Sequence, residues 1–240
     1  MKFAGKTETG LRSQNEDSFM LLHTDGLDAV AVSDGMGGHQ AGEVASSLAI
    51  ETLRELLLNS RESREAVLSS AFIEANHVVH QKASAADEMH GMGCTLVAAS
   101  MDAHEFTAAN VGDSRLYYFD GESIRQITHD HSYVAELVRR GVITPEEAKT
   151  HPQRNLITRA IGTDKRILAD IFTCEWSAGD MLLLCSDGLC GVMNEDEMAT
   201  FLKSDEGLDD ICAKMIDRAL ALGSRDNITV VLVQNDGGIA

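Results

Sequence analysis

Two long helical patterns follow each other directly in the chain, and they constrain the fold more than any other feature. In the first, apolar side chains recur at three- and four-residue spacing over residues 44–57, and the second repeats that spacing over residues 67–79. Such spacing places apolar residues on one side of an α-helix, so each helix must bury one face against another layer. Strand-like segments lie before and after this pair and do not alternate with helices. The pattern therefore predicts an α+β fold in which helices cover an antiparallel sheet or sandwich.

The strand-like segments are short and apolar or β-branched. They cover residues 3–7, 18–22, 29–33, 95–100, 106–111, 116–119, 124–127, 168–173, 181–185 and 228–233. Asp120-Gly121 separates two of them and predicts a two-residue hairpin turn. A further amphipathic helix is expected from Leu208 to Leu222. Since no repeat or Pro/Ser-rich linker interrupts the chain, we expect one domain over residues 1–240.

The charge of the chain excludes some classes of partner. With 20 Lys and Arg against 38 Asp and Glu, the formal net charge is −18. Nucleic acid and anionic membrane surfaces both require a basic face, so neither is an expected partner. No apolar run reaches the roughly 18–20 residues that cross a bilayer, and the first residues turn polar too soon for a signal peptide.

The cysteines indicate a compartment. There are five, an odd number without a C-x-x-C pair: Cys94, Cys174, Cys185, Cys190 and Cys212. Scattered, unpaired cysteines in a chain of this size are typical of reduced thiols, so we expect a cytoplasmic protein.

The segment from Arg139 to Arg166 differs from its surroundings. It contains both prolines of the chain and seven of its Lys and Arg residues against three acidic ones, a local charge of +4. Thr144-Pro145-Glu146-Glu147 combines an N-cap, a first-turn proline and a capping-box glutamate. This combination predicts a short helix that begins after Thr144.

Aspartates stand at the ends of several predicted strands: Asp17, Asp34, Asp113, Asp187 and Asp226. A single Asp-Gly is usually only a turn. Asp34 differs, because a glycine-rich loop and then a helix follow it, with no return strand at hairpin distance. If these carboxylates meet at one rim, they would repel each other unless cations lie between them. Oxygen ligands of this kind suit Mg²⁺ or Mn²⁺ and would allow two-metal hydrolysis of a phosphate ester.

Five motifs in order carry a family resemblance. They are Arg12 with Asn15-Glu16-Asp17, Val32-Ser33-Asp34-Gly35-Met36-Gly37-Gly38-His39, Asn110-Val111-Gly112-Asp113-Ser114-Arg115, Cys185-Ser186-Asp187-Gly188-Leu189, and Arg225-Asp226-Asn227-Ile228-Thr229-Val230. Together they resemble the type 2C, metal-dependent Ser/Thr protein phosphatases in their compact bacterial form. The resemblance runs over nearly the whole chain. It implies a sandwich of two antiparallel sheets flanked on both sides by helix pairs, with the metals at one end.

The resemblance also implies a role for each matching residue. Asp34 would bridge two Mn²⁺ or Mg²⁺ ions, with the carbonyl of Gly35 on the second and Asp187 and Asp226 on the first. Asp17, with Glu16, would hold metal-bound waters, and Asp113 with Asp187 would bind a weaker third ion. Arg12 would clasp the substrate phosphate, and Asn227 would orient its neighbours. The implied reaction is direct attack of a metal-bridging hydroxide on phosphoserine or phosphothreonine.

Two features of the resemblance leave alternatives open. Met36 stands where many eukaryotic relatives have a histidine, so His39 is the candidate for protonating or positioning the leaving oxygen; otherwise it is simply an exposed loop residue. Residues 132–166 lie where the family has a flap beside the active site. Arg139 and Arg140 would gather phosphoproteins there, or the segment is a solvated helix pair. Cys94 replaces a common threonine, and we expect only a packing change.

Rival interpretations have specific weaknesses. Cys212 and Arg218 have the C-x₅-R spacing of cysteine-dependent phosphatases, but the residues between them continue an amphipathic helix, which predicts an inert core thiol. A catalytically weak regulatory module would have lost an aspartate or Arg12, and a nuclease conflicts with the net charge. The expected partners are phosphorylated proteins and a cognate Ser/Thr kinase, and the expected state is a monomer.

Overall fold

A computed structural model describes residues 1–37, 41–85, 87–89 and 91–237. One sheet has five strands in the order β1-β11-β10-β7-β8, and every pair is antiparallel. Their bounds are β1 Lys2–Glu8, β7 Arg115–Phe119, β8 Ile124–Gln126, β10 Met181–Cys185 and β11 Ile228–Gln234. The two ends of the described chain meet in this sheet, because β1 pairs with β11 along its whole length.

The second sheet runs in the order β2-β3-β5-β6-β9, with the short strand β4 paired to the end of β3. It is also antiparallel throughout. The bounds are β2 Asp17–Thr24, β3 Leu27–Met36, β4 Gly93–Cys94, β5 Leu96–Met101, β6 Glu105–Val111 and β9 Asp170–Glu175. All ten predicted strands are therefore present.

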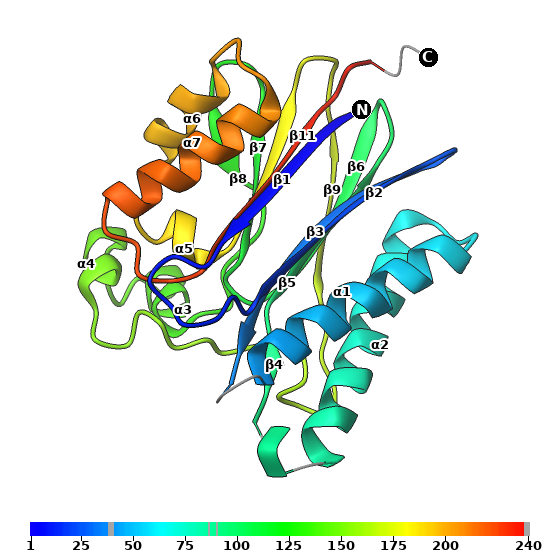
Figure 1. Cartoon of the computed structure of the whole chain (residues 1–240), viewed down its shortest axis with the longest axis vertical. Helices are drawn as coiled ribbons and strands as arrows, with labels where there is room; N and C mark the ends of the chain where they lie inside the picture. The colour runs from blue at the N-terminus through cyan, green and yellow to red at the C-terminus, as the bar shows by residue number, and fades with distance from the viewer. Residues whose placement is uncertain (38–40, 86, 90, 238–240) are drawn as a thin grey trace.

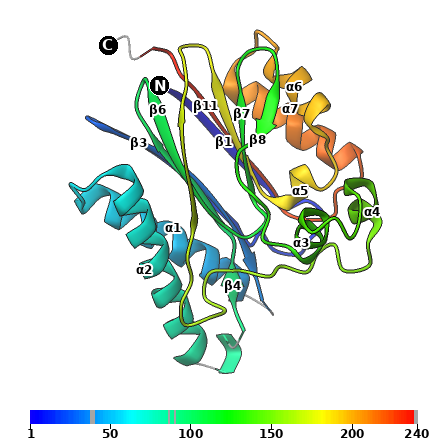
Figure 2. The ribbon, with the colours of Figure 1, turned by 180° about the vertical axis from the view of Figure 1, so that it is seen from behind.

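The two sheets pack face to face between two helical layers, as Figures 1 and 2 show from opposite sides. Helices α1 (Ala41–Asn59) and α2 (Arg64–Ala85) cover the second sheet, and a 3₁₀ turn, η1 (Asp87–Met89), follows them. Helices α6 (Glu195–Leu202) and α7 (Leu208–Ala221) cover the first sheet. This arrangement confirms the predicted α+β sandwich with a helix pair on each side.

Alternation along the strands explains why the sandwich needs four layers. In β3, Val30 and Val32 face the other sheet, whereas Ala29 and Ala31 pack under α1 and α2. Successive side chains of a strand point to opposite faces. A strand that is apolar at every position must therefore be covered on both faces. In β10, Leu183 likewise packs under α6 and α7, whereas Leu182 and Leu184 face the core between the two sheets.

Short elements were harder to predict than long ones. Helix α4 (Pro145–Thr150) begins after Thr144 with the predicted capping box. The sequence patterns did not predict α3 (Tyr133–Arg139), α5 (Asp187–Cys190) or α6, which are too short for a clear apolar period. The predicted two-residue hairpin is also wrong: the loop between β7 and β8 spans residues 120–123, because Phe119 pairs with Ile124. The Asp120 side chain accepts hydrogen bonds from the amides of Glu122 and Ser123 and closes this longer turn.

None of the described helices is both long and apolar enough to cross a membrane.

Candidate active site

Asp17 and Asp34 face each other at one end of the sandwich, in register across β2 and β3. Asp17 is buried, and its Oδ2 accepts hydrogen bonds from Ser186 Oγ at 2.7 Å and Thr229 Oγ1 at 2.6 Å. Thr229 belongs to β11 in the other sheet, and Ser186 directly follows its strand β10. These contacts join the two sheets at the point where the predicted aspartates lie.

Asp34 is held through its backbone. Its amide donates to Thr95 Oγ1 at 2.9 Å, and its carbonyl accepts from the Thr95 amide at 2.8 Å. The next residue, Gly35, has no room for a side chain, since a Cβ there would lie 2.1 Å from the Gly42 carbonyl oxygen. The backbone of the Asp34-Gly35 pair is thus fixed and closely packed.

Asp187 and Asp226 approach from the other sheet. Asp187 is the first residue of α5, and Ser186 alone separates it from the end of β10. Asp226 precedes β11. A Cβ on Gly188 would lie 1.9 Å from the carbonyl oxygen of Asn227, so the two loops that carry Asp187 and Asp226 touch directly.

The gathered carboxyl groups perturb one another. Burial, opposed by hydrogen bonds from Thr229 and Ser186, raises the pKa of Asp17 to about 7. Burial, and then the charges of Asp17 and Asp187, raise the pKa of Asp34 well above its ordinary value. The pKa of Asp187 is raised by burial and by Asp226. Without a positive partner the site therefore favours protonated carboxyl groups.

The side chains fit a cation site. Asp17 Oδ1 and Asp187 Oδ1 are buried and have no hydrogen-bond partner, and unpaired buried oxygens of this kind are costly unless a ligand satisfies them. An all-carboxylate set is the chemistry that Mg²⁺ and Mn²⁺ prefer. Within the described ranges no three acidic, His or Cys side chains form a ready-made cage.

Arg12 lies at the mouth of the site. Its side chain is 53% exposed, and Nη2 donates to Asp226 Oδ2 at 2.7 Å. Although partial burial alone would lower the pKa of Arg12, the charge of Asp226 raises it above its ordinary value. The guanidinium is thus charged, accessible and tethered beside the acidic cluster.

Asn227 fixes the loop that carries Arg12. Its Nδ2 donates to the carbonyls of Thr9 and Gln14, and its Oδ1 accepts from the Glu16 amide at 2.8 Å. These three bonds span the segment between β1 and β2. Asn227 therefore holds the backbone of this segment on both sides of Arg12. Burial raises the pKa of Glu16, which lies against Gly42.

Asp113 lies in the turn between β6 and β7. Burial, then the charges of Asp187 and Asp130, raise its pKa to about 7. Gly112 has a φ of +110° and packs its Cα against Thr95, where a Cβ would come within 2.6 Å. Ser114 Oγ is 2.7 Å from Thr95 Oγ1, so Thr95 contacts both the Asp34 backbone and the Asp113 turn. Thr95 directly follows Cys94 in the sequence, and no local pattern marks it as a site residue.

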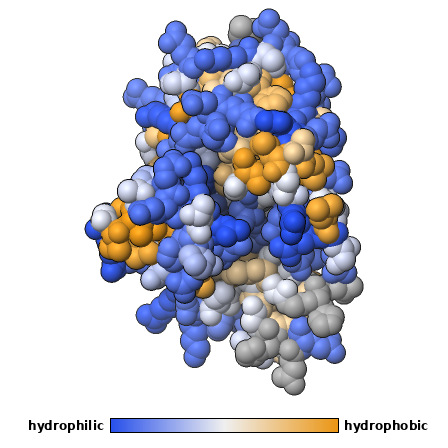
Figure 3. Space-filling model, turned by 90° about the vertical axis from the view of Figure 1, so that its left-hand side faces the viewer, coloured by the Kyte–Doolittle hydropathy of each residue, from blue (hydrophilic) through white to orange (hydrophobic). Residues whose placement is uncertain are grey.

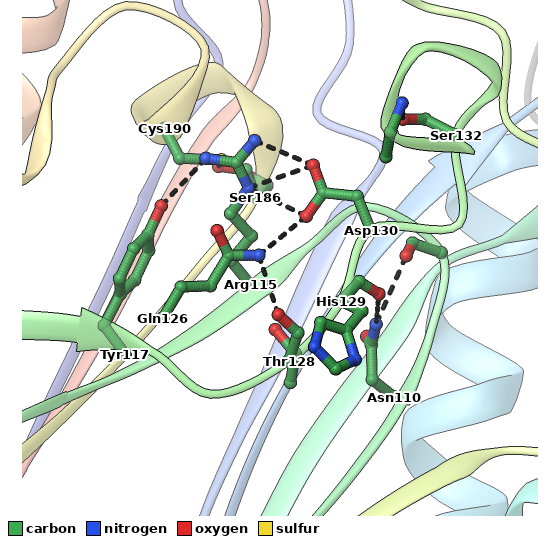
Figure 4. A network of polar contacts seen from close by, with 12 residues as sticks. Asn110, Arg115, Tyr117, Gln126, Thr128, His129, Asp130, Ser132, Ser186 and Cys190 are labelled. Carbon is green, nitrogen blue, oxygen red and sulfur yellow. Dashed lines mark hydrogen bonds and ion pairs between the residues drawn. The ribbon is translucent and has the colours of Figure 1, made fainter. Parts of the chain in front are cut away.

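Behind the site, Arg115 holds the segment that leads into α3 (Figure 4). Its guanidinium donates to both oxygens of Asp130, and Gln126 Nε2 donates to Asp130 Oδ1 and the Thr128 carbonyl. Asn110 Nδ2 adds a bond to the His129 carbonyl. Arg115 belongs to one of the five sequence motifs. Its partner Asp130 lies 15 positions away, too far for a local pattern to indicate the pair.

His131 joins the start of residues 132–166 to the turn after β6 and to strand β9. Its Nδ1 accepts from the Gly112 amide at 3.1 Å, and its Nε2 is 3.1 Å from Asp170 Oδ2. Arg159 Nη1 donates to the other oxygen of Asp170. Because burial lowers the pKa of His131, the neutral imidazole with its proton on Nε2 satisfies both contacts. Nothing in the sequence pattern distinguished this histidine.

The predicted substrate-binding residues Arg139 and Arg140 lie in the segment 132–166. The backbone of Ser132 bridges to Ile157, and the Thr158 amide donates to the His131 carbonyl, so the two ends of residues 132–157 lie together. Arg140 pairs with Glu136 on the same helix end. Arg139 and Arg140 therefore lie on α3 and its C-cap, outside the carboxylate cluster.

Three residues from the sequence analysis remain: His39, Cys94 and Cys212. His39 lies outside the described residues. Cys94 is fully buried, and its Sγ contacts the Ala45 carbonyl, as expected of a packing residue. Cys212 is buried in the middle of α7, and burial raises its pKa to about 12. A thiol in that environment is not a nucleophile at neutral pH, which removes the cysteine-phosphatase alternative.

Figure 3 shows one face of the molecule, which has a hydrophilic hollow near its middle and apolar patches beside it.

Comparison with known proteins agrees with this geometry. A family model described as "Protein phosphatase 2C" matches residues 4–229. The chain is 40% identical over 238 residues to the serine/threonine phosphatase stp of Listeria monocytogenes, covering 96% of this chain and 94% of that protein.

Solved structures of phosphatases are also similar to this chain. Serine/threonine phosphatase Stp1 from Staphylococcus aureus superposes with a TM-score of 0.91 and 36% identity, over 97% of this chain and 94% of that one. The catalytic domain of the serine threonine protein phosphatase PstP, solved in complex with 2 manganese ions, superposes with a TM-score of 0.87 and 34% identity, over 97% of each chain.

Proposed function

The chain belongs to the protein phosphatase 2C family, and from this membership we propose how its residues divide the work of the reaction. The protein is a metal-dependent protein serine/threonine phosphatase, and its substrates are phosphoproteins. The observation that carries the proposal is the convergence of Asp17, Asp34, Asp187 and Asp226 from both sheets, with two unpartnered carboxylate oxygens among them.

We assign the cation-binding role to Asp34, Gly35, Asp187 and Asp226, for two ions, Mn²⁺ or Mg²⁺. Asp17 lies behind them, with one oxygen held by Ser186 and Thr229 and the other unpartnered. Asp113, with Asp187, is the proposed site of a third ion. Bound divalent cations supply an acidified water and positive charge for the phosphoryl oxygens.

Arg12 is proposed to bind the substrate phosphate. Its planar guanidinium can donate to two phosphate oxygens at once. In the present structure one of its nitrogens bonds Asp226, so phosphate would compete with or share that contact. Asn227 and Glu16 keep the Arg12 loop in place, and Arg12 stabilises the charge that develops on the transferred group.

Three further assignments complete the proposal. His39 is the proposed proton donor to the leaving oxygen. Residues 132–166 form a flap, and Arg139 and Arg140 in it attract phosphoproteins, which are anionic. We also propose that the enzyme is a cytoplasmic monomer that reverses the action of a cognate Ser/Thr kinase.

The test is hydrolysis of a phosphothreonine peptide and of p-nitrophenyl phosphate with Mn²⁺, Mg²⁺ or EDTA. We expect activity with a divalent cation, none with EDTA, and a loss of at least about a hundredfold in Asp34→Asn. Asp25→Asn, an exposed aspartate in the β2–β3 turn, is the matched control and should keep full activity. Equal rates with EDTA, or an active Asp34→Asn, would refute the proposed site.

A further inference from the structure

A recess lies beside Leu11, the residue before Arg12, and is lined by the loop after β1 and by the connection from α7 to β11. Its volume is about 550 Å³, and the residues that line it are Glu8, Gly10, Leu11, Leu220, Gly223, Ser224 and Arg225. That volume lies within the range of ligand sites in proteins. No residue of the proposed cation site lines it.

Apolar side chains line this recess although they face solvent. Leu11 is 74% exposed, and Leu220 is partly buried against the core beneath α7. One exposed leucine needs no explanation. Leu11, however, directly precedes Arg12, the proposed phosphate ligand, and its partner Leu220 stands across the recess.

Two glycines keep the recess open. Gly10 has a φ of +63°, and a Cβ there would lie 2.2 Å from the Asp226 carbonyl oxygen, so the loop packs directly on the segment before β11. Gly223 has a φ of +92°, and a Cβ there would meet nothing within 4 Å. The first glycine brings the walls together, and the second leaves space above the backbone.

Hydrogen bonds make the walls rigid. Asn227 Nδ2 holds the Thr9 and Gln14 carbonyls on either side of Leu11. Ser224 Oγ donates to the Gly188 carbonyl at 2.8 Å, and the Ser224 amide donates to the Ala219 carbonyl. A preformed site loses little conformational entropy when it binds a ligand.

The charges at the rim do not select a ligand. Arg225 and Glu8 both line the recess and are exposed. In the part of the chain that the structure describes, neither forms an ion pair. One cation and one anion cancel, so selectivity must come from the apolar contact of Leu11 and Leu220.

We propose that this recess is a specificity subsite that takes an apolar side chain of the phosphoprotein, of the size of leucine, isoleucine or methionine. The inference rests on the proposed role of Arg12. Leu11 directly precedes Arg12 in the chain, so the selected residue should lie close in sequence to the phosphorylated one.

The experiment scans phosphothreonine peptides that carry a single leucine at each of the three positions on either side, with serine elsewhere. For the wild-type enzyme with Mn²⁺, one position should raise kcat/KM by about fivefold to tenfold over the all-serine peptide, because the open recess buries only part of a leucine side chain and full burial would be worth more than about tenfold. The gain should appear in KM. In Leu11→Ser the leucine-to-serine ratio of kcat/KM should fall to less than about twofold.

Leu58→Ser is the control, since Leu58 is a 50% exposed leucine at the end of α1 that does not line the recess. It should keep the wild-type ratio. A wild-type enzyme that hydrolyses all the peptides equally would overturn the subsite and leave the phosphatase assignment intact. A preference that survives in Leu11→Ser would also overturn it, because the selecting surface would lie elsewhere. Absence of hydrolysis of every peptide and of p-nitrophenyl phosphate would instead overturn the proposed site as a whole.

Discussion

Replacing Asp17 with asparagine should stabilise the metal-free protein, although Asp17 lies in the centre of the proposed site. Asp17 is buried, its Oδ2 accepts from Ser186 and Thr229, and its Oδ1 has no partner. An asparagine oxygen can accept the same two hydrogen bonds. Its amide nitrogen would replace the unpartnered oxygen and remove one negative charge from the cluster.

The size of the effect follows from the pKa. Burial raises the pKa of Asp17 from 3.8 to about 7, and one pKa unit corresponds to about 1.4 kcal/mol. An acid whose pKa is raised in the folded state destabilises the fold once it ionises. The penalty is absent below the unfolded pKa, grows as the pH rises, and is complete above the folded pKa. Asp17→Asn should therefore gain about 4 kcal/mol at pH 8 but less than about 2 kcal/mol at pH 5.

The assay is urea unfolding in EDTA at pH 8 and pH 5, followed by circular dichroism. Asp25→Asn, at an exposed turn, is the control and should change the free energy of unfolding by less than about 0.5 kcal/mol at either pH. Added Mn²⁺ should stabilise the wild type more than Asp17→Asn, because a ligand of the folded state stabilises it by mass action. A metal-free Asp17→Asn that is no more stable at pH 8, or whose gain does not shrink at pH 5, would refute this account of the acidic cluster.

Three other substitutions test separate parts of the structure. Gly188→Ala places a Cβ 1.9 Å from a backbone carbonyl and should lower stability by about 1–3 kcal/mol or more in urea unfolding; Gly207→Ala, whose Cβ would meet nothing closer than 3.7 Å, should not. Cys212→Ser should retain phosphatase activity while it loses about 1–3 kcal/mol of stability through a buried hydroxyl; inactivity of the folded variant would restore the thiol mechanism. His131→Ala should make residues 132–157 more sensitive to limited proteolysis, and unchanged cleavage would show that the contacts of His131 with Gly112 and Asp170 do not hold the flap base.

Local sequence patterns predicted the regular elements well for physical reasons. The faces of α1 and α2 follow from contacts three and four residues apart, and the double burial of β3 follows from uninterrupted apolar residues. The Thr144 capping box is equally local, and the structure contains it. The length of the turn after β7 was not predictable from Asp120-Gly121, because cross-strand register decides where a hairpin closes.

The composition of the candidate site was also visible in the sequence, but its assembly was not. The motifs identified Asp17, Asp34, Asp187 and Asp226 as residue types suited to cations. The contact between Ser186 and Asp17 joins residues 169 positions apart, and no local spacing encodes such a distance. The geometry of this contact depends on how the two sheets pack against each other.

What the sequence determined alone is therefore the set of strands and long helices, the α+β class and the family membership that five ordered motifs imply. Only the tertiary structure decided which neighbours those motifs meet: Thr95 under Asp34, Asp170 beside His131, and Leu220 across from Leu11. The physical reason is the separation along the chain over which each kind of interaction acts. Periodicity and capping arise from neighbours within one turn or two strand residues, whereas burial, raised carboxyl pKa values and recesses arise where segments far apart in the chain exclude water together.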